Sequence, residues 1–309
     1  MITKVFGTGG IGTGIFFQLE DNRPISREES RAAVLTNFKD YCKGHIIMHY
    51  VSVLSPDTHV YMLGMAGRDE PGKNLLTEMQ SAGIDTRYVQ LVDEAPTMFS
   101  VCYQFADSAG GNITSSNSAC GLVTPAYIEC CGHEIDAESI VLAAPEVPLE
   151  SRIRLLEIGR ARGAFTIASF LSAEAKNFAQ AGGFALSDLI SINVDEALSV
   201  CDDGINAAAE VIAAANPFIK LAITEGKSGI HLFENKTRAH IPCFPVNVVS
   251  AAGAGDAFLG GLIAATIAGK DFVDAATYGA VAARFAVSCA NTIAETVRPE
   301  TLANFIANL

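Results

Sequence analysis

Short apolar runs and stretches of helical pattern alternate along the chain after residue 58. Residues 59–67 predict a strand, and residues 72–83 predict a helix that ends at Gly83. The alternation continues, with strands expected at 139–145, 164–169, 188–193 and 218–224 and helices expected at 148–163, 173–183 and 204–216. This pattern predicts an α/β fold in which helices cover both faces of a mostly parallel sheet.

Two segments break the alternation, residues 11–26 and residues 97–116. The first looks like a strand until Pro24, and the second reads as two strands around a Gly-Gly turn. In the second segment the letters M-S-C-Q alternate with F-V-Y-F, which is typical of a sheet with one exposed face. We expect the two segments to form a small β-sheet that stands apart from the main one. After the first segment, Ser26 as N-cap and Glu29 as its capping-box partner predict the start of a helix.

Composition and charge narrow the classes of function. Half of the 309 residues are hydrophobic and 18% are charged, which predicts a sizeable core. The formal net charge of −13 argues against general nucleic-acid binding, which needs a basic surface. No apolar run is long enough to span a membrane, and no signal peptide is visible. The eight cysteines are scattered without a C-x-x-C pair, so we expect free thiols in a reducing cytoplasm.

The glycines at the start of the chain raise the question of a dinucleotide site. Gly7, Gly9 and Gly12 spell G-x-G-x-x-G, and an apolar strand precedes them. The helix that this fingerprint requires is missing, because Pro24 would interrupt it. No strand with a terminal acid follows at the spacing that a nicotinamide cofactor needs. The favoured interpretation is a close-packed turn, and an NAD-dependent oxidoreductase remains the weaker alternative.

A second glycine-rich turn, Gly253-Ala254-Gly255, runs directly into a long apolar helix. From this turn to Leu309 the pattern is almost wholly helical. The first N–H groups of such a helix have no internal partners, and with the helix dipole they favour an anion. Asp256 stands in the first turn, where a carboxylate could take a proton from a hydroxyl that attacks a phosphate. The competing interpretation is that Asp256 only stabilises the helix N-terminus.

The stretch SAAGAGDAFLGG at residues 250–261 resembles the D-T-x-G-A-G-D signature of the ribokinase-like (PfkB) carbohydrate kinases. Four further motifs follow the order found in this family. They are LGMAGRDEPGKNLLTEMQSAGID at 63–85, APEVPLES at 144–151, NVDE at 193–196 and TEGKSG at 224–229. The resemblance covers most of the chain after residue 58.

The resemblance implies one ribokinase-like domain over residues 1–309, with a three-layer α/β/α architecture. It also implies that segments 11–26 and 97–116 form a β-sheet lid over the acceptor, and that the protein could form a homodimer through this lid. The opening glycines would lie where the chain passes from the core sheet to the lid, at the floor of the acceptor pocket.

The resemblance also assigns roles to individual residues. Asp256 would be the general base, and the amides of Gly253, Ala254 and Gly255 would form the anion hole. Asn193 and Glu196 would organise Mg²⁺ largely through water. The positions that would line ATP are Thr224, Gly226, Gly229 and Asn193. Taken alone, the pair at 193 and 196 would read as a helix cap, and the glycines after Thr224 as an ordinary turn.

The departures from the family pattern cluster where the acceptor binds. Gly12 stands where relatives have an aspartate, and His45 stands near an asparagine position, although it could equally be a buried helix-terminal histidine. Glu146 keeps an acid that often contacts the sugar. Ser250 replaces the aspartate that helps relatives to bind a monovalent cation, so potassium activation is doubtful.

These observations lead to one main hypothesis and two alternatives. The main hypothesis is an ATP- and Mg²⁺-dependent kinase that phosphorylates a hydroxyl of a small sugar, nucleoside or polyol. The loss of acceptor groups motivates the first alternative, a catalytically idle binding or regulatory protein on the same fold. The oxidoreductase is the second alternative.

Overall fold

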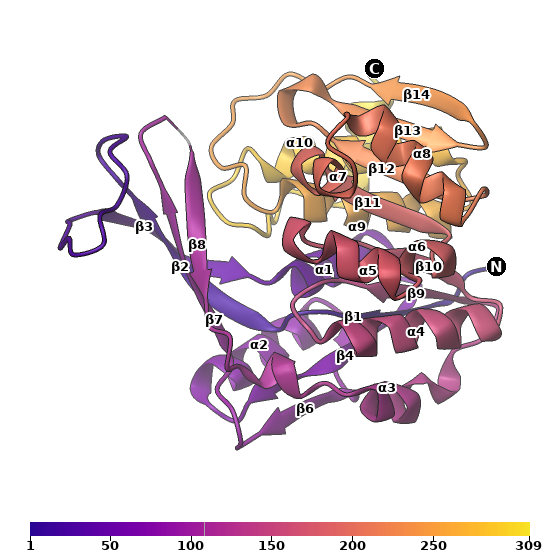
Figure 1. The fold of residues 1–309 in the computed structure, drawn as a ribbon, viewed down its shortest axis with the longest axis horizontal. Coiled ribbons are helices and arrows are strands. Elements are labelled where there is room, and N and C mark those ends of the chain that lie inside the picture. The colour runs from indigo at the N-terminus through magenta and orange to yellow at the C-terminus, as the bar shows by residue number, and fades with distance from the viewer. Residues whose placement is uncertain (108) are drawn as a thin grey trace.

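The computed structural model describes residues 1–107 and 109–309, with the side chains of residues 37 and 38 outside the description. Ten strands form a large sheet in the order β14-β13-β12-β11-β10-β9-β1-β4-β5, and β6 also pairs with β4 (Figure 1). The pairings are parallel, except that β13 runs antiparallel to β12 and β14. The strands are β1 Lys4–Thr8, β4 His59–Gly67, β5 Ile84–Asp85, β6 Val89–Val92, β9 Ser139–Ala143, β10 Phe165–Ala168, β11 Leu189–Asn193, β12 Lys220–Thr224, β13 Ile230–Glu234 and β14 Thr237–Ile241.

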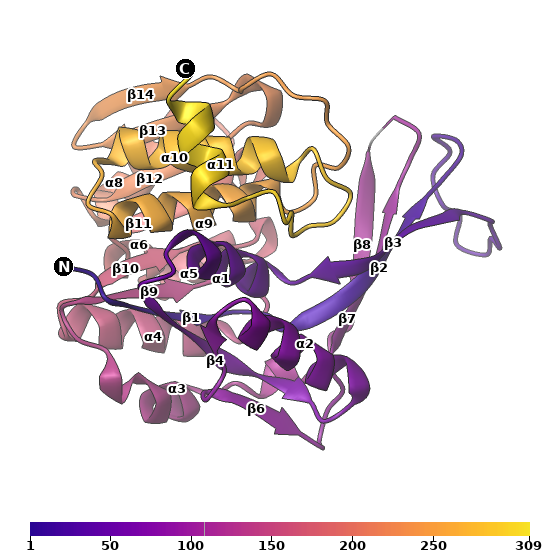
Figure 2. The same ribbon diagram turned by 180° about the vertical axis from the view of Figure 1, so that it is seen from behind.

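Helices cover both faces of this sheet, as the alternation predicts. Helices α3 to α8 lie on the face seen in Figure 1, and α1, α2, α9, α10 and α11 lie on the face seen in Figure 2. Their bounds are α1 Lys43–Leu54, α2 Glu70–Ser81, α3 Pro125–Cys131, α4 Leu149–Ala161, α5 Ala175–Gln180, α6 Gly183–Leu186, α7 Val194–Val200, α8 Ile205–Ala215, α9 Ala254–Ile267, α10 Phe272–Ala286 and α11 Pro299–Ile306. The three-layer α/β/α architecture is therefore confirmed.

The central strands form the core. All residues of β9 are buried, and only the first residue of β4 is exposed, because both faces of these strands lie under helices. No described helix is long and apolar enough to cross a membrane. The C-terminal part is less helical than expected, since residues 287–298 connect α10 to α11 without helix.

A second sheet of four strands, in the order β3-β2-β7-β8, projects from the edge where β1 and its parallel neighbours end (Figures 1 and 2). Its strands are β2 Gly12–Gln18, β3 Val34–Tyr41, β7 Met98–Gln104 and β8 Gly110–Thr114. Three of these strands lie within the two segments that the sequence singled out. The small sheet is thus confirmed, and it is one strand larger than expected.

The helix expected from Ser26 does not form. Glu29 does accept the backbone N–H of Ser26 at 3.0 Å, but strand β3 follows instead of a helix. Pairing with β2 holds this segment extended, so tertiary contacts override the local capping signal. The Gly-Gly pair expected in a turn is also misplaced, because Gly110 and Gly111 begin β8.

Candidate active site

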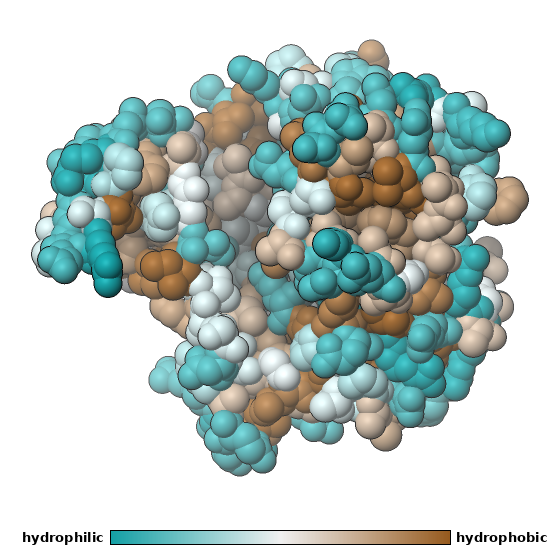
Figure 3. All heavy atoms as spheres, viewed as in Figure 1, coloured by the Kyte–Doolittle hydropathy of each residue, from teal (hydrophilic) through white to brown (hydrophobic). Residues whose placement is uncertain are grey.

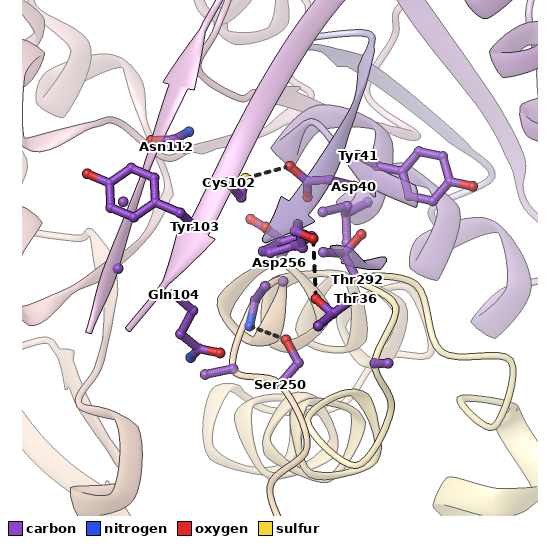
Figure 4. Close-up of a pocket in the computed structure, with 18 of the residues that line it drawn as sticks. Thr36, Asp40, Tyr41, Cys102, Tyr103, Gln104, Asn112, Ser250, Asp256 and Thr292 are labelled. Atoms are coloured by element: carbon purple, nitrogen blue, oxygen red, sulfur yellow. Dashed lines mark hydrogen bonds between the residues drawn. The ribbon is translucent and has the colours of Figure 1, made fainter. Parts of the chain in front are cut away.

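A cavity of about 510 Å³ lies between the small sheet and the N-terminus of α9. The surface is hollowed here, between the projecting sheet and the main body (Figure 3). Figure 4 shows Asp40 of β3 and Cys102 of β7 above Asp256, Thr292 beside it and Ser250 below it. We call this space the acceptor cavity. It opens at the carboxyl edge of the parallel strands, which is where ligands bind in open α/β sheets.

The small sheet has a polar face and an apolar face. Gln18, Cys102 and Gln104 belong to the polar face and line the acceptor cavity. Ile15 and Ile113 both pair with Val101 and alternate with the cavity-lining positions, so they lie on the opposite face. The alternation of M-S-C-Q with F-V-Y-F separates the two faces only in part, because Tyr103 from the second set also lines the cavity.

The glycine-rich turn forms the N-terminus of α9. Gly253 is the N-cap in the left-handed region, with φ at 77°. A Cβ at this position would lie 2.9 Å from the backbone oxygen of Thr292, so only glycine fits. The N–H of Ala254 donates to the Ala251 carbonyl at 3.3 Å, whereas the N–H groups of Gly253 and Gly255 have no partner among the described residues. Two of the three amides predicted for the anion hole, those of Gly253 and Gly255, are therefore unpaired in the structure.

Asp256 lies at the junction of two cavities. It lines the acceptor cavity and also a small cavity of about 50 Å³ toward β11 and β12. Its carboxylate has no hydrogen-bond partner within the described part of the chain. Burial raises the pKa of Asp256 to about 7, with the Glu146 and Glu196 carboxylates adding to the rise and the Lys43 ammonium opposing it. A carboxylate with such a pKa is suited to proton transfer near neutral pH.

Lys43 is a site residue that the sequence reasoning missed. It begins α1, lines both cavities that Asp256 lines, and places its Nζ 3.1 Å from Oε1 of Glu196. A lysine in the first turn of a helix opposes the helix dipole. That unfavourable placement, next to the glycine of the C-K-G stretch, is the signal that could have identified it.

Asn193 and Glu196 form the N-terminal cap of α7. The Asn193 side chain accepts the N–H of Glu196 at 2.8 Å, and Glu196 Oε2 accepts the N–H of Asn193 at 2.8 Å. The capping interpretation is therefore confirmed. Both oxygens of Glu196 are engaged, one of them by Lys43, so direct coordination of a metal would need a rearrangement. Contact between Glu196 and a metal through a water molecule would need no such rearrangement.

The small cavity is lined by donor groups of the kind that bind Mg²⁺. Apart from the Lys43 ammonium, its polar wall consists of oxygen-bearing side chains, which are the ligands that Mg²⁺ prefers. The hydroxyl of Ser169 in this wall is buried without a hydrogen-bond partner among the described residues. The described wall residues with oxygen-bearing side chains are Ser169, Ser191, Asn193, Glu196, Thr224 and Asp256.

A separate, largely apolar pocket of about 250 Å³ lies on the other side of the α9 N-terminus. Thr224 at the end of β12, Gly226 and Gly229 line it together with Ala254 and Gly255. The structure thus brings three of the four predicted ATP positions to the turn that carries the unpaired amides. Asn193 lies nearby, because it pairs with Thr224 across β11 and β12. We call this space the nucleotide pocket.

Glu146 lines the acceptor cavity after the end of β9. Its carboxylate accepts the backbone N–H of Lys43 at 3.1 Å, and its φ of 75° is unusual for a residue other than glycine. A Cβ on Gly10 would lie 2.5 Å from Oε2 of Glu146. Burial raises the pKa of Glu146 to about 7, and Lys43 opposes this rise.

The other two predicted acceptor residues do not line the cavity. A Cβ on Gly12 would lie 2.7 Å from Sγ of Cys42, so this position faces packed side chains. His45 is 1% exposed and packs its ring against Tyr41, with centroids 4.7 Å apart. Burial lowers the pKa of His45 to about 3, so the imidazole is neutral. The alternative of a buried helix-terminal histidine agrees with this placement.

The opening glycines lead from β1 into β2 without a helix, so the dinucleotide fingerprint lacks its structural context. Gly9 lies against α1, where a Cβ would be 2.9 Å from the Cα of Gly44. The interpretation as a close-packed turn agrees with this contact.

Comparisons with known proteins place this chain in a family. The model of the pfkB family carbohydrate kinases matches residues 47–298. A ribokinase of Bacillus subtilis is 25% identical over 267 residues, which cover 86% of this chain and 87% of the relative. A deoxyribokinase of Salmonella typhi is 25% identical over 227 residues, covering 72% and 74% of the two chains.

Solved structures share the fold over the whole chain. The ribokinase of Giardia lamblia superimposes with a TM-score of 0.86 at 16% identity, covering 100% of this chain and 99% of its own. The ribokinase of Thermotoga maritima gives a TM-score of 0.81 at 20% identity, with 100% of both chains covered. The fold is therefore ribokinase-like. With the family model matching most of its length, the chain belongs to the pfkB family of carbohydrate kinases.

Proposed function

We propose that this protein is an ATP-dependent kinase that transfers the γ-phosphoryl group to a hydroxyl of a small sugar, nucleoside or polyol. The observation that carries the proposal is the position of the α9 N-terminus. Its unpaired amides and Asp256 lie where the nucleotide pocket meets the acceptor cavity. The relatives named ribokinase and deoxyribokinase support a sugar as the acceptor class.

In this proposal Asp256 is the general base. The acceptor hydroxyl gives its proton to the Asp256 carboxylate, and its oxygen forms a bond to the γ-phosphorus while the bond to the ADP oxygen breaks. The N–H groups of Gly253 and Gly255 donate to the oxygens of the transferred group, where negative charge is spread. Mg²⁺, held through water near Asn193 and Glu196, would neutralise phosphate charge when bound.

The small sheet is the proposed lid over the acceptor. It comprises the predicted segments 11–26 and 97–116 together with β3, within one domain over residues 1–309. Closing it over the cavity would exclude water, which otherwise competes as phosphoryl acceptor. We propose no potassium site, because Ser250 carries no charge and its hydroxyl accepts the N–H of Ala252 at 3.3 Å.

An ADP-release assay over a panel of sugars, nucleosides and polyols tests this function. We expect turnover with at least one acceptor, dependent on ATP and Mg²⁺. Nucleotide binding without turnover on any acceptor would instead support the idle binding protein. A rise in the unfolding temperature with NAD(P), and no rise with ATP, would support the alternative that the protein is an oxidoreductase.

The rate is expected to depend on pH through Asp256. Because the base acts when ionised and its pKa is about 7, kcat should rise as pH increases through neutrality and then level off. Lys43→Met should move this midpoint to higher pH, since the ammonium that lowers the pKa is removed. The exposed Lys73→Met serves as control. A pH profile of kcat that is the same in wild type and Lys43→Met would contradict the assignment.

The apolar face of the small sheet is the proposed surface of a homodimer. Ile113 is 71% exposed and Phe99 42% exposed, and both project from the face opposite the cavity. Ile113→Asp should convert a dimer to a monomer, because it would bury a charge in the contact. Phe218→Asp, at an exposed site on the main body, should leave the dimer intact. Light scattering after gel filtration measures the oligomeric state of the wild type and of both variants. A monomeric wild type would refute the proposal.

A further inference from the structure

The acceptor cavity is acidic. Asp40, Glu146 and Asp256 contribute carboxylates to its wall. Among the described residues that line it, Lys43 is the only one with a basic side chain. Its ammonium lies 3.1 Å from Glu196, so part of its charge is already balanced outside the cavity. The other described polar groups on the wall are uncharged amides and hydroxyls, from residues Gln18, Thr36, Tyr41, Tyr103, Gln104, Asn112, Ser250 and Thr292.

Asp40 is held in place by two neighbouring strands of the small sheet. It lies on β3, directly opposite Gly14 of β2. Its Oδ2 accepts the Ser100 hydroxyl at 2.9 Å and the Cys102 thiol at 3.1 Å, both from β7. Figure 4 shows the carboxylate beside Cys102 at the edge of the cavity. Both interactions use the same oxygen, so Oδ1 has no partner among the described residues and can accept hydrogen bonds from a ligand.

Gly14 makes this arrangement possible. A Cβ at Gly14 would lie 2.2 Å from the hydroxyl of Ser100 and 3.2 Å from the Cβ of Asp40. Any side chain at this position would push apart the two residues that form the hydrogen bond. The glycine on β2 therefore supports a carboxylate on β3.

We infer that Asp40 binds the hydroxyls of the acceptor, and that the acceptor is a hydroxylated compound without an anionic group. This inference rests on the proposed kinase function and specifies its substrate class. Carboxylate oxygens accept hydrogen bonds, so those of Asp40 and Glu146 favour ligands that donate them, such as neutral polyols or amino sugars. A phosphorylated sugar would bring further negative charge against these carboxylates, with no free basic side chain on the described wall to compensate.

Acceptors that differ only in charge test the inference that the acceptor carries no anionic group. We would measure ADP release with an accepted neutral sugar, with its phosphate ester that keeps the reacting hydroxyl, and with its amino analogue. We expect kcat/KM for the ester to be at least about 100-fold below that for the neutral sugar, and the amino analogue to remain a substrate. Preference for the ester would overturn the inference while leaving the kinase function intact.

Variants test the role of Asp40. Asp40→Asn should raise KM for the neutral acceptor by about 10-fold or more, because a charge-assisted hydrogen bond becomes a neutral one, while kcat changes little. Ser100→Ala should have a smaller effect of the same kind, since it removes only a positioning contact. Glu20→Gln, an exposed acid beyond the end of β2, is the matched control and should leave KM unchanged. An unchanged KM in Asp40→Asn, in a variant with wild-type thermal stability, would overturn the inference.

Calorimetry separates this inference from the kinase proposal. If no acceptor supports turnover, the kinase function fails, but binding of neutral sugars can still be measured. Weaker sugar binding in Asp40→Asn than in Glu20→Gln would support the role of Asp40 independently of catalysis. Equal binding in the two variants would count against it.

Discussion

Asp256→Asn is expected to lower kcat by about 1000-fold while leaving nucleotide affinity nearly unchanged. A general base typically contributes 10²- to 10⁴-fold, and about 1000-fold corresponds to about 4 kcal/mol of activation free energy. The amide keeps the size of the side chain but cannot take the proton of the acceptor hydroxyl. Because Asp256 lines the acceptor cavity and not the nucleotide pocket, ATP binding should persist.

The control for this variant is Asp274→Asn. Asp274 is also an acidic residue in the first turn of a helix, at the start of α10. Loss of a dipole interaction costs about 0.3–1 kcal/mol of stability at such a position and should not affect turnover. If Asp256 only stabilised its helix, the two variants would behave alike. Near-normal turnover in Asp256→Asn would therefore support the interpretation that Asp256 only stabilises the N-terminus of its helix.

The second large effect is expected at Gly253. Gly253→Ala should lower kcat by about 100-fold, the loss typical when one donor to a developing negative charge is displaced. The new Cβ would lie 2.9 Å from the Thr292 carbonyl oxygen, and the backbone has a φ of 77° that alanine resists. The turn must therefore shift, and its amides would no longer point at the phosphoryl group.

Gly269→Ala isolates the effect of backbone strain. Gly269 follows the C-terminus of the same helix with a φ of 76°, but a Cβ there would meet no atom within 4 Å. Both variants should lose about 1 kcal/mol or more of stability from the left-handed backbone. Thermal unfolding and single-turnover kinetics together measure the difference. Equal turnover in the two variants would contradict a role of Gly253 in phosphoryl transfer.

The order of strands and helices could be predicted because the main sheet is buried on both faces. Its strands are therefore continuous apolar runs, and residues 59–67 coincide with β4. The segment after Ser26 could not be predicted in the same way. Its local signal is a capping box, and only pairing with β2, a contact far from local sequence, makes residues 34–41 a strand.

The glycine-rich turn, the helix and the place of Asp256 in its first turn were predictable because one continuous stretch of sequence encodes them. The acceptor side was not, because it is assembled from separate elements. Asp40 and Lys43 reach the cavity from β3 and the start of α1, next to the segment mistaken for a helix. Gly12 and His45 are expected at the acceptor only because their positions match the family pattern, and in the structure both lie against packed side chains. A place in the sequence does not by itself tell whether a position faces a cavity or the packed interior.

The most direct test of the account is a crystal structure with ADP, an aluminium fluoride mimic of the transferred phosphoryl group, and an accepted sugar. The mimic should accept hydrogen bonds from the N–H groups of Gly253 and Gly255, with the reacting hydroxyl within hydrogen-bond distance of Asp256. Phosphates bound instead at the turn between Gly7 and Gly12, with the amides of α9 turned away from them, would contradict it.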